Sequence, residues 1–123
     1  MTPAKRILIA DDNQDAADTL AVLLDFLGYE TRTAYNGQDA VAIAQEFKPC
    51  LVILDINMPL MDGYEAAKTL RRTEGNRVIL IALTAISNRE AKARAADAGF
   101  DIHLTKPVGG DELEGLLQQV LHA

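Results

Sequence analysis

Hydrophobic positions along the chain follow two alternating patterns, short continuous apolar runs and longer segments with helical periodicity. The apolar runs predict five strands, at about residues 7–10, 29–34, 51–54, 78–83 and 102–105. The periodic segments predict five helices, at about residues 14–27, 37–47, 62–72, 87–98 and 111–121. Strands and helices that alternate in this way predict an α/β fold, with a parallel sheet covered by helices on both faces.

The polarity of each predicted strand indicates its place in the sheet. Strands 51–54 and 78–83 are apolar at every position, so we expect them at the centre. Strand 29–34 is interrupted by Glu30 and Arg32, so we expect it at an edge. With right-handed crossovers, this pattern favours a doubly wound, flavodoxin-like sheet of five strands in the order 2-1-3-4-5. The length of 123 residues predicts a single domain, 1–123, with a core of about 5–121.

The helical segments carry further signals at their ends and on their faces. In helix 14–27 the apolar positions at helical spacing are Ala16, Leu20, Leu23 and Leu27, which we expect to be buried together. Asp62 and Ser87 are expected to cap the third and fourth helices. Nearly all apolar residues of the fourth helix are alanine, so we expect it to be the least firmly anchored. Basic residues of the third and fourth helices, including Arg71, are expected to be solvated.

Composition and charge exclude several classes of protein. The net charge of −6 argues against nucleic acid as the main partner. The longest apolar run has six residues, 78–83, far below the ~18 that a membrane span requires, so no membrane insertion is expected. The single cysteine, Cys50, excludes an internal disulfide framework and indicates a reducing, cytoplasmic location.

Polar residues follow four of the five predicted strands. Asp11 and Asp12 follow the first, Asp55 the third, Thr84 the fourth and Lys106 the fifth. Because sites in open parallel sheets form at the carboxyl ends of the strands, we expect these side chains to meet. Oxygen donors without histidine or cysteine favour a hard cation such as Mg²⁺. A carboxylate beside that ion can act as a nucleophile toward phosphorus, with lysine and a hydroxyl group neutralising the phosphoryl oxygens.

Each of these residues also has an ordinary structural interpretation. Asp11 and Asp12 could be helix N-caps, since carboxylates are favoured at that end of a helix. The Thr84 hydroxyl could simply bond to backbone at a strand end, and Lys106 could be solvated. His103 could be a partly exposed strand histidine.

The pairs Asp11-Asp12, Thr84-Ala85 and Lys106-Pro107, with the segment 55–63, resemble the CheY-like receiver domain of two-component response regulators. The resemblance covers about residues 5–121 and is greatest to receivers of hybrid sensor kinases. It implies that Asp55 accepts a phosphoryl group from a histidine kinase or a histidine phosphotransfer protein. It also implies a Mg²⁺ site formed by Asp11, Asp12, Asp55 and the backbone carbonyl of Asn57, and a cis peptide bond between Lys106 and Pro107.

The same resemblance implies a conformational switch through Thr84 and an aromatic residue three positions before the lysine. That position is His103, whose smaller polar ring departs from the family pattern. The downstream protein target is expected to bind helix 87–98, strand 102–105 and helix 111–121. Such a protein is a signalling switch rather than an enzyme, catalysing only its own phosphoryl transfer and dephosphorylation. Two alternatives remain: an aspartyl-nucleophile phosphatase, whose second acid would be replaced by Asn57, and a degenerate receiver that only binds proteins.

Overall fold

A computed structural model describes residues 4–86 and 88–122. It contains five parallel strands in the order β2-β1-β3-β4-β5, which confirms the predicted fold class and strand order. The strands are β1 (Arg6–Ala10), β2 (Glu30–Ala34), β3 (Leu51–Asp55), β4 (Ile79–Thr84) and β5 (Ile102–Thr105). The helices are α1 (Gln14–Phe26), α2 (Gly37–Phe47), α3 (Gly63–Glu74), α4 (Arg89–Ala98) and α5 (Gly110–Leu121), with a short 3₁₀ helix, η1 (Gly75–Arg77).

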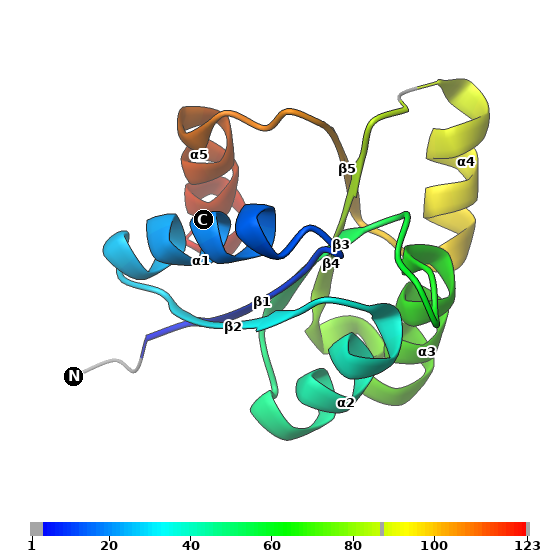
Figure 1. The fold of residues 1–123 in the computed structure, drawn as a ribbon, viewed down its shortest axis with the longest axis horizontal. Helices are drawn as coiled ribbons and strands as arrows, with labels where there is room; N and C mark the ends of the chain where they lie inside the picture. Colours follow the sequence, from blue (N-terminus) through cyan, green and yellow to red (C-terminus); the bar gives the residue numbers. More distant parts are fainter. Residues whose placement is uncertain (1–3, 87, 123) are drawn as a thin grey trace.

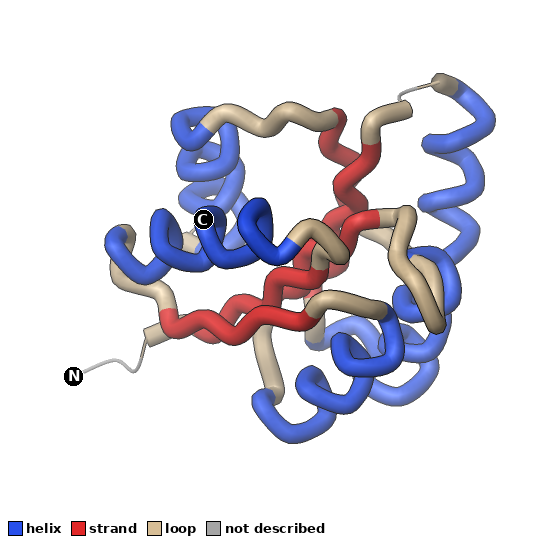
Figure 2. Tube along the Cα trace, in the orientation of Figure 1, coloured by secondary structure: helices blue, strands red, loops and turns tan. Residues whose placement is uncertain are grey.

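The helices form one layer on each face of the sheet. Helices α1 and α5 cover one face, and α2, α3 and α4 cover the other (Figures 1 and 2). Successive strand residues point to opposite faces, so Ile7 and Ile9 pack toward α1 and α5 while Leu8 and Ala10 pack toward α2 and α3. The central strand β3 is buried along its whole length, as its continuous apolar sequence predicts.

Short polar side chains begin four of the helices. Asn13, Asn36, Asp62 and Asn88 each accept a hydrogen bond from the backbone N–H three residues further on. Asp62 was predicted as a cap and is one. The prediction for α4 was wrong by one position, because Asn88 caps the helix, whereas Ser87 lies outside the described residues. Both residue types suit a cap, so composition alone could not separate the two adjacent positions.

The buried face of α1 differs from the predicted one. Ala16 is exposed and Leu20, Leu23 and Leu27 are only partly buried. The residues that the sheet buries completely, or almost so, are Ala17, Ala21 and Leu24. Leu20 and Leu27 are partly buried and pack against the same core cluster. The predicted buried face was therefore displaced by about one position.

Arg71 in α3 is partly buried rather than solvated, so that expectation was also wrong. Its guanidinium group donates to the backbone carbonyls of Gly75, Val78 and Gly99 and to the carboxylate of Asp101. The Asp101 carboxylate also accepts the N–H of Leu80. One side chain therefore ties together α3, the start of β4 and the turn between α4 and β5.

No helix in residues 4–86 and 88–122 is both long enough and apolar enough to cross a membrane.

Candidate functional site

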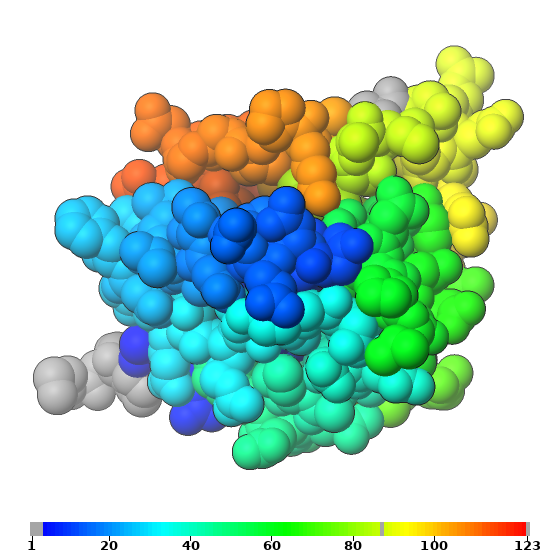
Figure 3. Space-filling view, in the orientation of Figure 1, coloured from blue at the N-terminus to red at the C-terminus, as the bar shows by residue number. Residues whose placement is uncertain are grey.

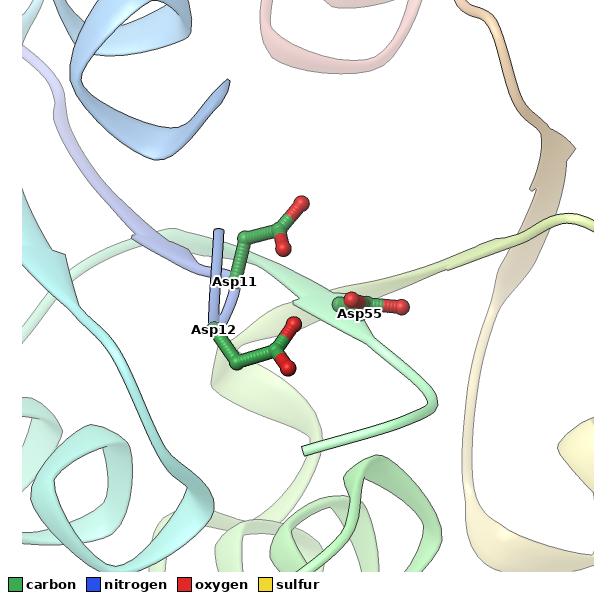
Figure 4. A group of neighbouring side chains, drawn as sticks. All are labelled: Asp11, Asp12 and Asp55. Carbon is green, nitrogen blue, oxygen red and sulfur yellow. The ribbon is translucent and has the colours of Figure 1, made fainter. Parts of the chain in front are cut away.

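Three carboxylates meet at the carboxyl edge of the sheet. Asp11 and Asp12 follow β1, Asp55 ends the neighbouring strand β3, and Figure 4 shows the first two side chains directed toward the third. One carboxylate oxygen from each residue lies within 4.8 Å of the others. Asp11 and Asp12 do not cap α1, since Asn13 does so. Asp11 nonetheless makes a local bond, since its carboxylate accepts the backbone N–H of Asn13 at 3.0 Å.

Lys106 joins this acidic cluster from the far end of the chain. Its ammonium nitrogen lies 3.1 Å from Asp55 Oδ2 and 3.4 Å from Asp11 Oδ2. Its backbone N–H donates to the carbonyl of Thr84 at 2.7 Å, which holds the segment after β5 beside β4. The bond from Lys106 to Pro107 is cis. Figure 3 shows the segment after β1 (dark blue) lying against those after β3 (green) and β5 (orange).

The carboxylates of Asp11 and Asp55 are unusual because they are buried. Among the residues that the structure describes, the buried polar ones are Asp11, Asp55 and Thr84, each at most 5% exposed. A buried carboxylate is costly unless it is paired or bound to a metal. Lys106 pairs with two of the carboxylates, while Asp12 remains exposed at the edge of the cluster. The three acids exceed the one ammonium group, so the site retains excess negative charge.

The pKa values follow from this environment. Burial raises the pKa of Asp55 to about 6; hydrogen bonding to Lys106 opposes the rise, and the charge of Asp11 adds to it. Desolvation is thus the largest cause of the raised pKa of Asp55, and like-charge repulsion from Asp11 is secondary. For Lys106, burial alone would lower the pKa of the ammonium group, but hydrogen bonding and the charges of Asp55 and Asp11 raise it above its usual value.

Thr84 ends β4 next to the acidic cluster. In the sheet register Asp55 pairs with Leu83, so Thr84 lies one residue beyond the carboxylate on the adjacent strand. Its hydroxyl oxygen accepts the N–H of Ile86 at 3.1 Å. The expectation of a hydroxyl bonded to backbone is thus met, but the hydroxyl keeps its own proton to donate elsewhere.

The loop of residues 56–62 continues directly from Asp55. The N–H of Asn57 donates to Asp55 Oδ1 at 3.3 Å, and the N–H of Gly63 donates to the carbonyl of Ile56 at 2.9 Å. Met58 is buried in the core, whereas Asn57 is exposed. The loop therefore leaves the Asn57 backbone beside the carboxylate that precedes it.

The residues present fit a divalent cation of the Mg²⁺ type. All the side-chain donors are carboxylate oxygens, which hard cations prefer, and a cation would offset charge that Lys106 alone does not balance. No histidine or cysteine belongs to this group.

His103 is not part of the acidic cluster. It lies in β5 beside a small cavity of about 100 Å³ under α4, which Lys92 and Phe100 also line. Both ring nitrogens are buried and have no hydrogen-bond partner within the described chain. Burial, and then the charge of Lys92, lower the pKa of this imidazole below its usual value. Its expected part in a switch stays a prediction.

Two supporting features were missed from the sequence. Arg71 belongs to no recognisable sequence motif, because its partners are mainly backbone carbonyl groups of other segments. Gly37 packs directly against the backbone of the loop after β3, a contact that the sequence analysis did not predict. The pair Asn36-Gly37 was the available signal, since glycine at a helix start can mark a close approach.

Comparison with known proteins gives one consistent family. The model of the response regulator receiver domain matches residues 7–118. The hybrid signal transduction protein dokA of Dictyostelium discoideum is 38% identical over 94% of this chain and 7% of its own length. The transcriptional regulator RpaA of Synechocystis is 33% identical over 94% of this chain and 48% of its own length. The chain spans half or less of the length of the curated relatives it matches.

Solved structures agree with these sequence matches. A chemotaxis protein of Vibrio cholerae superposes with a TM-score of 0.90 at 30% identity, covering 96% of this chain and 99% of that one. The receiver domain of a sensor histidine kinase from Pseudomonas aeruginosa, solved with a magnesium ion in its active-site cleft, has a TM-score of 0.88. It too is 30% identical and covers 98% of this chain and 100% of that one.

Proposed function

This chain belongs to the response regulator receiver domains, the signalling switches of two-component systems, and on that premise we propose that Asp55 accepts its phosphoryl group. The observation that carries the proposal is the convergence of three carboxylates within 4.8 Å, with the Lys106 ammonium between Asp55 and Asp11. Phosphoryl transfer needs positioning and charge neutralisation more than covalent help, and this arrangement supplies both.

In the proposed reaction a carboxylate oxygen of Asp55 forms a bond to phosphorus. The bond between phosphorus and the imidazole nitrogen of the donor breaks, and its electron pair returns to that nitrogen. Lys106 neutralises one phosphoryl oxygen, and the Thr84 hydroxyl donates a hydrogen bond to another. Asp11, Asp12, Asp55 and the Asn57 carbonyl would hold Mg²⁺, which when bound supplies positive charge to the remaining oxygen.

Phosphorylation would act by shifting a population between two states. We infer that Thr84, drawn toward the phosphoryl group, pulls on the segment that leads into α4, because its hydroxyl is bonded to the N–H of Ile86. His103 lies under α4 and would respond when that helix moves. The downstream protein would then recognise the face formed by α4, β5 and α5.

The phosphoryl donor would be a histidine kinase or a histidine phosphotransfer protein. A groove of about 710 Å³ leads to Asp11 and Lys106, and its apolar wall includes Leu20, Leu23 and Val108. This volume would accommodate side chains of a docking protein while its histidine reached Asp55. Cys50 is a free thiol, in keeping with a cytoplasmic location.

Incubation with Mg²⁺ and labelled acetyl phosphate tests this proposal. We expect one stable label per chain, resistant to acid and labile to base, and no label on Asp55→Asn. Repeated turnover with release of phosphate would instead indicate the aspartyl-nucleophile phosphatase. Absence of label on the folded parent protein would indicate a degenerate receiver that only binds partners. Either of these two results would overturn the proposal.

A further inference from the structure

The N-terminus of α2 presses against the loop that carries Asn57. Gly37, the first residue of α2, has no side chain, and a Cβ atom there would lie 1.9 Å from the carbonyl oxygen of Met61 and 2.6 Å from its carbonyl carbon. Non-bonded heavy atoms do not approach so closely. The obstructing atoms belong to the backbone, so no change of side-chain rotamer could relieve the contact.

The same loop meets a second backbone contact at its other end. A Cβ atom on Gly63 would lie 2.5 Å from the carbonyl oxygen of Asp55 and 2.8 Å from the Cα atom of Ile56. Residues 56–62 are therefore held between α2 on one side and the end of β3 on the other. Both contacts require glycine, because only glycine allows two backbones to come this near.

Between these contacts the loop has few soft torsions. Pro59 has a restricted φ, and Leu60 is held in the left-handed region at φ 69°, which costs free energy for a residue with a side chain. The N–H of Met61 donates to the carbonyl of Pro59 at 2.7 Å. A displacement at Met61 would consequently be passed toward Asn57 rather than absorbed between them.

The loop would also yield before the helix does. Helix α2 is fixed by buried Ala40, Val41, Ala44 and Phe47, whereas Asn57, Pro59 and Leu60 in the loop are exposed. Moving α2 would disturb the core on that face of the sheet, while moving the loop would disturb mainly the packing of Ile56, Met58 and Met61. A side chain at residue 37 would therefore displace the loop.

We propose that Gly37 is a positioning residue for the metal site: it sets how far the loop lies from α2 and thereby where the Asn57 carbonyl stands relative to Asp55. This inference rests on the proposed function in taking that carbonyl as a Mg²⁺ ligand. Gly37 itself touches neither the ion nor the phosphoryl group and acts only through the backbone of Met61.

The test is Gly37→Ala compared with Gly115→Ala. Gly115 lies in α5, where a Cβ atom would meet nothing within 4 Å, so this control adds the same methyl group without a contact. Titration with Mg²⁺ alone, followed by NMR, should show about tenfold weaker binding for Gly37→Ala, the lower end of the effect of supporting residues at metal sites. Gly115→Ala should bind as the parent does.

A second readout requires no metal. In the metal-free protein, Gly37→Ala should shift the amide resonances of Asn57 and its loop neighbours, and Gly115→Ala should not. If the parent failed to bind Mg²⁺, the proposed function would be wrong, yet these amide shifts would still test the positioning role. Unchanged loop amides together with parental Mg²⁺ affinity would refute that role.

Leu60→Gly provides the rescue. Glycine accepts a positive φ without strain and gives the loop a soft torsion between Met61 and Asn57. On its own this change should weaken Mg²⁺ binding slightly, since the loop becomes less ordered, but in the Gly37→Ala background it should restore most of the affinity. If Gly37→Ala does not fold, the double variant should fold and bind Mg²⁺. If the double variant did not fold, or folded without binding Mg²⁺, Gly37 would be required for the fold in general and not for the position of the loop. Either result would overturn the proposal.

Discussion

Helices α3 and α4 lie side by side on the same face of the sheet, yet they are anchored very differently (Figure 1). Helix α3 buries Tyr64, Ala66, Ala67 and Leu70 together with Gly63, whereas α4 buries only Ala95 and Ala98. Because buried apolar area stabilises an element roughly in proportion to its size, α3 is held far more firmly. Helix α3, which follows the loop of residues 56–62, is thus the more firmly held of the two, and α4, which follows Thr84, the less firmly held.

The anchoring of α4 is also uneven along its length. Its buried alanines lie in its C-terminal half, and the Gly99 carbonyl that follows accepts two hydrogen bonds from Arg71. Near its middle, Lys92 borders the small cavity beside His103. These contacts hold the C-terminal half of α4 more firmly than its N-terminal half.

Truncation of the core under α3 should have the largest effect. Leu70 is completely buried, so Leu70→Ala should lower the free energy of unfolding by about 2–5 kcal/mol. Ala95→Gly, the corresponding loss in α4, should cost only about 1 kcal/mol. Denaturant titration of both variants measures these costs, and equal costs would contradict the difference in anchoring.

Removal of the Arg71 guanidinium group should come next. Arg71→Met keeps the hydrophobic stem but leaves the carbonyls of Gly75, Val78 and Gly99 without this donor, which should cost about 2 kcal/mol. Arg72→Met is the matched control, since Arg72 is exposed and its loss should change stability by less than about 0.5 kcal/mol. Equal stability of the two variants would show that Arg71 anchors nothing.

Hydrogen exchange compares the two helices directly in the parent protein. Amides of α4 should exchange at least tenfold faster than those of α3 after correction for sequence, a difference of about 1.4 kcal/mol in opening free energy. Slower exchange in α4 than in α3 would remove the basis for treating α4 as the mobile element.

The smallest expected effect concerns His103. Replacement of two buried, unpartnered ring nitrogens by an apolar ring should make His103→Phe more stable by about 1 kcal/mol at neutral pH. The pKa of His103 is lowered from 6.5 in the folded chain, so below that pH the unfolded chain binds more protons and the parent loses stability as pH falls. The advantage of His103→Phe should therefore grow as pH falls through this range.

Denaturant titrations at several pH values measure this advantage. Asp55, with its pKa raised to about 6, gives the metal-free protein the opposite slope, but it does so in both proteins and cancels in their difference. An advantage of His103→Phe that stayed constant with pH would show that His103 does not titrate differently in the two states.

Sequence patterns were sufficient for the strand order and for the convergence of Asp11, Asp12 and Asp55, because both follow from rules about parallel sheets. They were insufficient where the outcome depends on distances between backbones. The buried face of α1 was misplaced by about one position, because several apolar residues lie on adjacent positions and only packing against the sheet selects Ala17, Ala21 and Leu24. Arg71 and Gly37 contact backbone carbonyl groups far along the chain. Every residue type carries such a group, so the sequence does not indicate which ones these two residues contact.

The ion pair between Lys106 and Asp11 joins residues 95 positions apart. A fragment that lacks either end of the chain therefore lacks one partner of this ion pair, and so does a nascent chain still short of β5. Under the function proposed above, such a chain would carry Asp55 without Lys106 beside it, so phosphoryl transfer would wait until the last strand has joined the sheet.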